Sequence, residues 1–94
     1  MNLVSVELLG KSSNAVVVRL PGRKHPGIVL QGDSLHAAEA TVTRALEALR
    51  SGETREAIGE MDALRATLRA LRRAYEQALA ENDLPLPYVK QGTD

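Results

Sequence analysis

The chain has 94 residues, no cysteine and a formal net charge of zero. This length argues for a single domain, and the 44% hydrophobic content argues for a globular chain. The absence of cysteine excludes disulfides, cysteine nucleophiles and thiolate metal sites, and it favours a cytoplasmic protein. No apolar run reaches membrane-spanning length, and the N-terminus lacks a basic segment followed by an apolar one, so we expect neither a membrane span nor a signal peptide.

The charge is unevenly distributed along the chain. Residues 1–32 hold four basic side chains against Glu7 alone, a net charge of +3, and residues 33–94 carry the compensating −3. A protein that binds nucleic acid over its whole surface is normally basic overall. Any nucleic-acid contact by this chain must therefore be local.

The first third of the chain has the pattern of short strands. Residues 3–9 alternate, which places Val4, Val6 and Leu8 on one face. A turn over 10–14 leads to a β-branched strand over 15–20, and a loop over 21–27 leads to a short strand over 28–31. Consecutive short strands joined by turns predict a three-stranded antiparallel meander over residues 1–32.

After Gly32 the apolar period changes to about 3.6, which predicts two helices. The first covers 33–51, with Asp33 or Ser34 as its cap and Ser51-Gly52 as its end. The second covers 53–82, with Thr54 as its cap, and ends before Pro85 and Pro87. The fold class is α+β, a meander followed by a helical hairpin with a long second helix. In the tail, 83–94, we expect a short edge strand near residues 88–89.

Each predicted helix has an apolar stripe. The first stripe consists of Leu35, Ala38, Val42, Ala45, Leu46 and Leu49, and the second of Ala57, Met61, Leu64, Leu68, Leu71, Tyr75 and Leu79. A second helix of about 29 residues is ~43 Å long, whereas a six-residue strand spans only ~20 Å. The helix should therefore extend beyond its own domain and, with no Phe or Trp in the core, we expect a homodimer or larger assembly through it. The alternative is a helix that bends or frays after residue 75.

No group of residues indicates catalysis. His25 and His36 lack metal-ligand spacing, the serines lack a nucleophile-elbow context, and Glu7 is the one carboxylate of the predicted strands. We therefore expect a protein that is not an enzyme and has no cofactor or metal.

Two basic groups are candidates for partner binding. Arg23, Lys24 and His25 lie in the predicted loop, and they either contact an acidic partner or a nucleic-acid backbone or form a solvated hairpin tip. The second group consists of Arg65, Arg69 and Arg72 on the predicted second helix. Asp62 and Glu76 lie three and four residues from Arg65 and Arg72, so the alternative for this group is a solvent-exposed face whose charges neutralise one another.

The string "PGIVLQGDSLHAA" from Pro26 to Ala38 resembles the HicB-like antitoxins of bacterial toxin–antitoxin systems. The matching positions are Pro26, Gly27, Gln31, Gly32, Asp33 and Ser34, and the resemblance covers residues 14–50. It implies a partial ribonuclease-H-like fold, in which a small antiparallel sheet packs on a helix, and a protein that masks a small toxin. The longer string from Asn14 to Leu35 resembles more closely a group of short bacterial proteins of unassigned function.

Two functions follow as hypotheses. The first is a non-enzymatic protein-binding module, HicB-like, whose partner is a toxin or another small protein. The second is a local nucleic-acid-binding protein that uses the basic loop 22–25. The matching motif itself forms a strand-to-helix corner, in which Gly27 and Gly32 supply conformational freedom at the two ends of a short strand.

Overall fold

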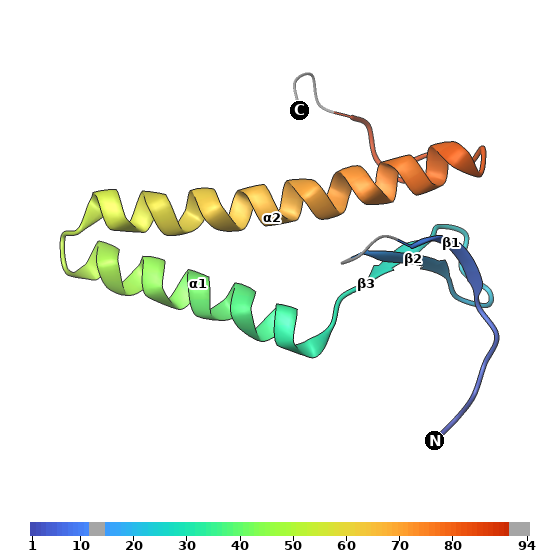
Figure 1. Ribbon diagram of the computed structural model, residues 1–94, viewed down its shortest axis with the longest axis horizontal. Helices are drawn as coiled ribbons and strands as arrows, with labels where there is room; N and C mark the ends of the chain where they lie inside the picture. The colour runs from blue at the N-terminus through green and yellow to red at the C-terminus, as the bar shows by residue number, and fades with distance from the viewer. Residues whose placement is uncertain (12–14, 91–94) are drawn as a thin grey trace. The chain divides into compact units, whose positions relative to one another are not determined.

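The structure, a computed structural model, describes residues 1–11 and 15–90. Its elements follow in the order β1 (Glu7–Lys11), β2 (Val16–Arg19), β3 (Gly27–Val29), α1 (Gly32–Arg50) and α2 (Thr54–Glu81) (Figure 1). The predicted α+β class, with a three-stranded antiparallel sheet followed by two helices of which the second is long, is confirmed.

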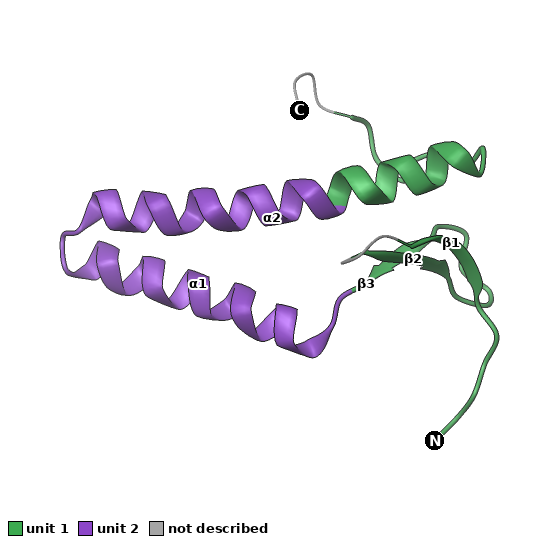
Figure 2. Cartoon of the chain, in the orientation of Figure 1, with its two compact units in different colours: residues 1–29, 72–94 green, residues 30–71 purple. Residues whose placement is uncertain are grey.

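The chain divides into two compact units (Figure 2). The first, here called the sheet unit, comprises Met1–Val29 and Arg72–Asp94; the second, the hairpin unit, comprises Leu30–Leu71. The long helix α2 therefore contributes its first turns to the hairpin unit and its last turns to the sheet unit.

The sheet has the order β1-β2-β3, and both pairs are antiparallel. The central strand pairs Val17 with Ile28, and a β-bulge between Leu8 and Gly10 interrupts the ladder with β1. Strand β2 then leads into a turn that is closed by a hydrogen bond from the Arg23 amide to the Leu20 carbonyl (3.1 Å). This turn has Pro21 second and Gly22 third, and Gly22 has a φ of 76°, the arrangement of a type II turn.

All three strands differ in their limits from the prediction. The first begins at Glu7 instead of Leu3, because Glu7 is the residue that pairs with Arg19 at the end of β2. Residues before Glu7 therefore have no partner strand, and a strand forms only where its backbone is paired. The predicted turn over 10–14 is wrong at Gly10 and Lys11, which belong to β1, and its residues 12–14 lie outside the described part. The third strand ends at Val29, the partner of the first residue of β2.

The sheet unit has its core between the sheet and the last turns of α2. Val17 and Leu79 are fully buried, and Tyr75 and Ala78 are buried beside them. The partly buried side chains packed around this core are Leu9, Ile28, Leu84 and Leu86. The prediction that the long helix extends beyond its own domain is therefore wrong at its C-terminal end, because the sheet and the tail cover that end.

Two polar contacts hold α2 to the sheet. The buried Tyr75 hydroxyl donates to the Pro26 carbonyl (2.7 Å), and the Asn82 amide donates to the Leu9 carbonyl (2.9 Å). The first contact gives the Pro-Gly part of the sequence motif a structural role, because it fixes the start of β3 against the helix. Burial alone raises the pKa of Tyr75 above its ordinary value.

The tail forms no strand within residues 82–90, so the expected edge strand near residues 88–89 is wrong there, and residues 91–94 lie outside the described part. Helix α2 ends at Glu81. Asp83, just beyond this end, has a φ of 54°, and the Leu84 amide donates back to the Leu79 carbonyl (3.0 Å). Pro85 and Pro87 then supply no amide hydrogens for a ladder. The tail folds back instead, so that the Tyr88 ring stacks on Tyr75 with 6.5 Å between the ring centroids.

The pKa of Tyr88 is expected to stand well above that of an ordinary tyrosine. Partial burial, together with the carboxylate of Glu76, which accepts the Tyr88 hydroxyl (2.9 Å), raises this pKa to about 12. Since the folded protein holds this proton more tightly than the unfolded chain does, the free energy of unfolding should fall as the pH rises from 10 towards 12.

Ring-carbon NMR during an alkaline titration measures this pKa for each tyrosine. Glu76→Gln should move the pKa of Tyr88 back towards 10, because it removes the neighbouring charge. The pKa of Tyr75 should stay where it is, since only burial raises it. A Tyr88 titration that is unchanged by Glu76→Gln would contradict the assigned cause.

The hairpin unit begins and ends its helices by backbone geometry. Gly52, with a φ of 77°, ends α1, and the Glu53 amide donates to the Ala48 carbonyl (2.7 Å), which confirms the predicted Ser51-Gly52 end. The predicted N-caps of both helices are wrong. The N-cap of α1 is Gln31, and Thr54 already lies inside α2, because the Glu53 carbonyl accepts the Ala57 amide (3.1 Å).

The reason for the misplaced first cap lies in the local contacts of Asp33. Its Oδ1 accepts the amide of Ser34 (2.8 Å), the residue next to it, and no side chain caps the helix. The extended backbone of Gln31 starts the helix one residue before Asp33, and Asp33 contributes negative charge in the first turn, where the helix dipole favours it.

Candidate protein-binding face of the hairpin unit

The two helices of the hairpin unit contact each other through small side chains. Ala45 and Ala48 of α1 and Ala57 of α2 are buried together. On one side of this contact the Arg44 guanidinium donates to both carboxylate oxygens of Glu60 (3.1 and 3.2 Å). The hydrogen bonds and the charge of Glu60 raise the pKa of Arg44 further above its ordinary value.

The larger apolar side chains of the hairpin unit lie outside this contact. Seven of them have exposed fractions between 37% and 59%, and together they are called the hairpin face: Leu35, Val42, Leu46, Leu49, Ile58, Met61 and Leu68. Most of them belong to the two predicted apolar stripes. Within the hairpin unit, Ala45 and Ala57 of those stripes are buried, Ala38, Leu64 and Leu71 are half-buried, and the other large members are exposed.

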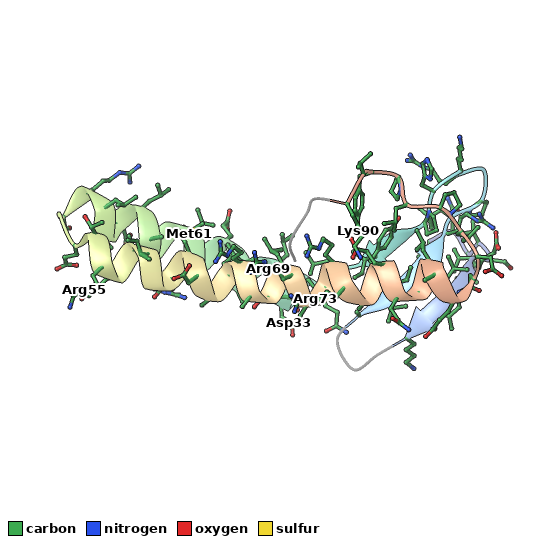
Figure 3. All side chains as sticks on the ribbon, turned by 90° about the horizontal axis from the view of Figure 1, so that it is seen from above. Asp33, Arg55, Met61, Arg69, Arg73 and Lys90 are labelled. Atoms are coloured by element: carbon green, nitrogen blue, oxygen red, sulfur yellow. The ribbon has the colours of Figure 1, made fainter. Side chains whose placement is uncertain are left out.

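These side chains share one side of the hairpin. At about 100° per residue, Leu46 and Arg44 are rotated about 100° from Ala45 in opposite senses. In α2, Met61 is rotated from Ala57 in the sense opposite to Glu60. Because the Arg44–Glu60 ion pair marks one side of the hairpin, the oppositely rotated apolar residues of both helices lie on the other side. Figure 3 shows Met61 and Arg55 on different sides of α2.

The borders of the hairpin face carry charge. Along α1 the same rotation places Glu39 and Glu47 at the border, with Arg50 between them in angle. Along α2 it places Arg65 and Arg69 beyond Met61 and Leu68, close to the angle of Ile58 two to three turns earlier, and this is the border of the face there. Asp62 lies beyond both arginines. The Arg65 guanidinium is 3.9 Å from the Asp62 carboxylate, and both side chains are about two-thirds exposed, so this ion pair is weak. The hairpin face thus has a predominantly acidic border on α1 and a predominantly basic border on α2.

The structure divides the predicted basic candidates between the two units. Arg65 and Arg69 border the hairpin face, whereas Arg72 lies in the sheet unit with its Nε 3.9 Å from Glu76. Arg23, Lys24 and His25 lie exposed on the loop between β2 and β3, also in the sheet unit.

The matching motif has structural roles at both of its ends. Pro26 is buried and Gly27 begins β3, while Gln31, Gly32, Asp33 and Ser34 form the start of α1. This corner and the arginines of the border are predicted by the sequence. The hairpin face is not predicted, and its signal in the sequence is the alternation of alanine with larger residues in the apolar stripe of the first helix.

The sheet unit has a second exposed apolar surface. The register places Leu8 opposite Val18, and Val29 opposite Val16, on the side of the sheet away from buried Val17. Leu8 and Val29 are each about half exposed. At the start of β1, the Arg19 guanidinium donates to both carboxylate oxygens of Glu7 (2.9 Å each), and this lowers the pKa of Glu7.

Within residues 1–11 and 15–90 the histidines and carboxylates form no group of three or more that could hold a metal ion. Among the same residues no helix is both long and apolar enough to cross a membrane. No curated protein and no solved structure matches the chain. A family model matches residues 1–88, which is nearly the whole chain. The chain therefore belongs to the family of unknown function DUF6959.

Proposed function

We propose that this protein is a non-enzymatic protein-binding module that uses the hairpin face as its binding surface. The observation that carries this proposal is that three alanines are the buried side chains of the hairpin unit, whereas the seven leucine-sized side chains of the hairpin face are exposed. Complete burial of a side chain of leucine size contributes about 1.5–3 kcal/mol, and a hairpin that functions alone would place such residues between its helices. A contiguous exposed apolar surface of this kind is typical of an interaction site.

The resemblance to HicB-like antitoxins supports a small protein, such as a toxin, as one class of partner. The resemblance covers residues 14–50 and so includes all of α1, which contributes four of the seven side chains of the hairpin face. The nucleic-acid alternative stays a prediction for the loop 22–25, whose Arg23 and Lys24 are exposed.

Affinity capture with matched lysine substitutions tests the proposal. Leu68→Lys places a charge in the hairpin face, and Ala66→Lys places the same charge on α2 about 180° from Ala57. Leu68→Lys should weaken the association of the protein with its partner, including other copies of itself, by about tenfold or more. Ala66→Lys should leave that association within about twofold of the wild type.

Quantitative mass spectrometry of captured proteins and sedimentation of the purified chain supply the two readouts. Circular dichroism of both variants verifies that the helices are retained. The proposal is wrong if the wild type neither captures a protein nor self-associates, or if both variants lose association equally.

A further inference from the structure

We infer that the hairpin face binds a second copy of this chain, with the two-fold axis parallel to the helices, so that α1 of each copy packs against α2 of the other. This inference rests on the proposed function and names the occupant of its surface. The resulting assembly of two hairpin units is a four-helix arrangement, in which each copy covers the exposed apolar side chains of the other.

The apolar spacing of the hairpin face suits helix-on-helix packing. In α1, Leu35, Val42 and Leu49 recur every seven residues, and in α2, Met61 and Leu68 do the same. A seven-residue repeat keeps the same side of a helix facing a neighbouring helix over several turns. Because alanines make the contact between α1 and α2, the repeated larger side chains are available to pack against a helix outside the hairpin. A second hairpin has the same spacing and the same length.

The border charges favour the second copy and select its orientation. With the axis parallel to the helices, the acidic border of α1 in one copy lies beside the basic border of α2 in the other. The two-fold symmetry produces two equivalent contacts of this kind. With the axis across the helices, α1 would face α1 and α2 would face α2, so that like charges would meet at both borders. Like charges placed across an interface cost several kcal/mol, and opposite charges favour the matching register.

The hairpin geometry then identifies the pairs. Since Arg44 is bonded to Glu60, and Ala48 packs with Ala57, residues at one height along the hairpin have numbers that sum to about 104–105. Glu39 therefore lies at the height of Arg65. A two-fold axis parallel to the helices preserves height, so Glu39 of each copy should face Arg65 of the other, in two equivalent ion pairs.

Charge exchange between these two positions tests the arrangement by sedimentation over a range of concentrations. The 10.1 kDa chain should sediment as a dimer. Glu39→Arg and Arg65→Glu should each raise the dimer dissociation constant by about tenfold or more, because each variant meets only like charge at both pairs. An equimolar mixture of the two variants should recover dimer, and so should the chain that carries both exchanges.

Asp33→Arg is the matched control. It makes the same change of net charge on α1, at a position rotated about 140° from Leu46 and away from the hairpin face, and it should leave the dissociation constant within about twofold. Circular dichroism of every variant verifies its helix content. These exchanges are made at exposed positions, so a loss of dimer with full helix content is a loss of association.

Cross-linking gives an independent measurement, because the chain has no cysteine of its own. Glu39→Cys mixed with Arg65→Cys should form a disulfide between chains under mild oxidation, and Glu39→Cys alone should form far less. A dimer that tolerates both charge exchanges separately would overturn the arrangement. A monomeric wild type whose hairpin face captures a different protein would overturn the second copy as occupant while leaving the proposed function in place. A monomeric wild type with no captured protein would overturn both.

Discussion

Leu79→Ala is expected to lower the free energy of unfolding by about 2–5 kcal/mol, the range measured for leucine-to-alanine changes in packed cores. The Leu79 side chain is 0% exposed, and it lies with Val17, Tyr75 and Ala78 in the core of the sheet unit. Its removal would leave a cavity between α2 and the sheet, which Leu84 and Leu86 of the tail border. For a small domain a loss of this size is a large share of the total stability.

Denaturant unfolding followed by tyrosine fluorescence measures this loss directly. Tyr75 and Tyr88 both lie in the sheet unit, so their emission reports on the unit that Leu79 stabilises. Leu3→Ala is the matched control, because the Leu3 side chain is 90% exposed, and it should change the free energy of unfolding by no more than about 0.5 kcal/mol. Equal losses for the two variants would contradict the assigned core.

Gly10→Ala is expected to lower the free energy of unfolding by about 1–3 kcal/mol, although it adds a single carbon. The β-bulge after Leu8 brings the backbone of Gly10 close to α2, and a Cβ at Gly10 would lie 2.8 Å from the Cβ of Ala78. Neither atom is at the end of a flexible side chain, so the strand or the helix would have to move. Movement here would also disturb Leu79, the next residue along the helix.

A double-mutant cycle separates this steric cause from other effects of the substitution. Ala78→Gly alone should cost about 1 kcal/mol through helix propensity. In that background Gly10→Ala should be tolerated, because the nearest atom of Ala78 that remains, its Cα, is 3.7 Å away. Gly27→Ala is the control, since an added Cβ there meets nothing within 4 Å. Equal costs of Gly10→Ala in the two backgrounds would contradict the close approach as the cause.

The element order and the fold class could be predicted from the sequence because both depend on local patterns. Apolar periods of two and of 3.6 distinguish strands from helices, and the glycine at position 52 marks a helix end through its own backbone freedom. The limits of β1 could not be predicted in this way. They depend on where β2 ends, which is a property of the paired strand and not of residues 3–6.

The candidate site could be predicted only in part. Arg65 and Arg69 were selected for their charge, and they lie at the border of the hairpin face. The seven apolar residues of the face were not identified as a surface. An apolar stripe on a helix indicates that one side will be covered, but it carries no information about which neighbour covers which part of the stripe.

Helix α2 shows most clearly what the sequence determines and what the tertiary structure determines. Its apolar stripe, its length and its end before Pro85 all follow from residue order, because helix propensity and periodicity act over a few turns. The division of that stripe follows from contacts between distant segments: Tyr75 and Leu79 are buried against the sheet, Ala57 is buried against α1, and Met61 and Leu68 are exposed. Burial depends on which surfaces meet in three dimensions, so the tertiary structure alone decides which part of the stripe forms the core and which part is left for a partner.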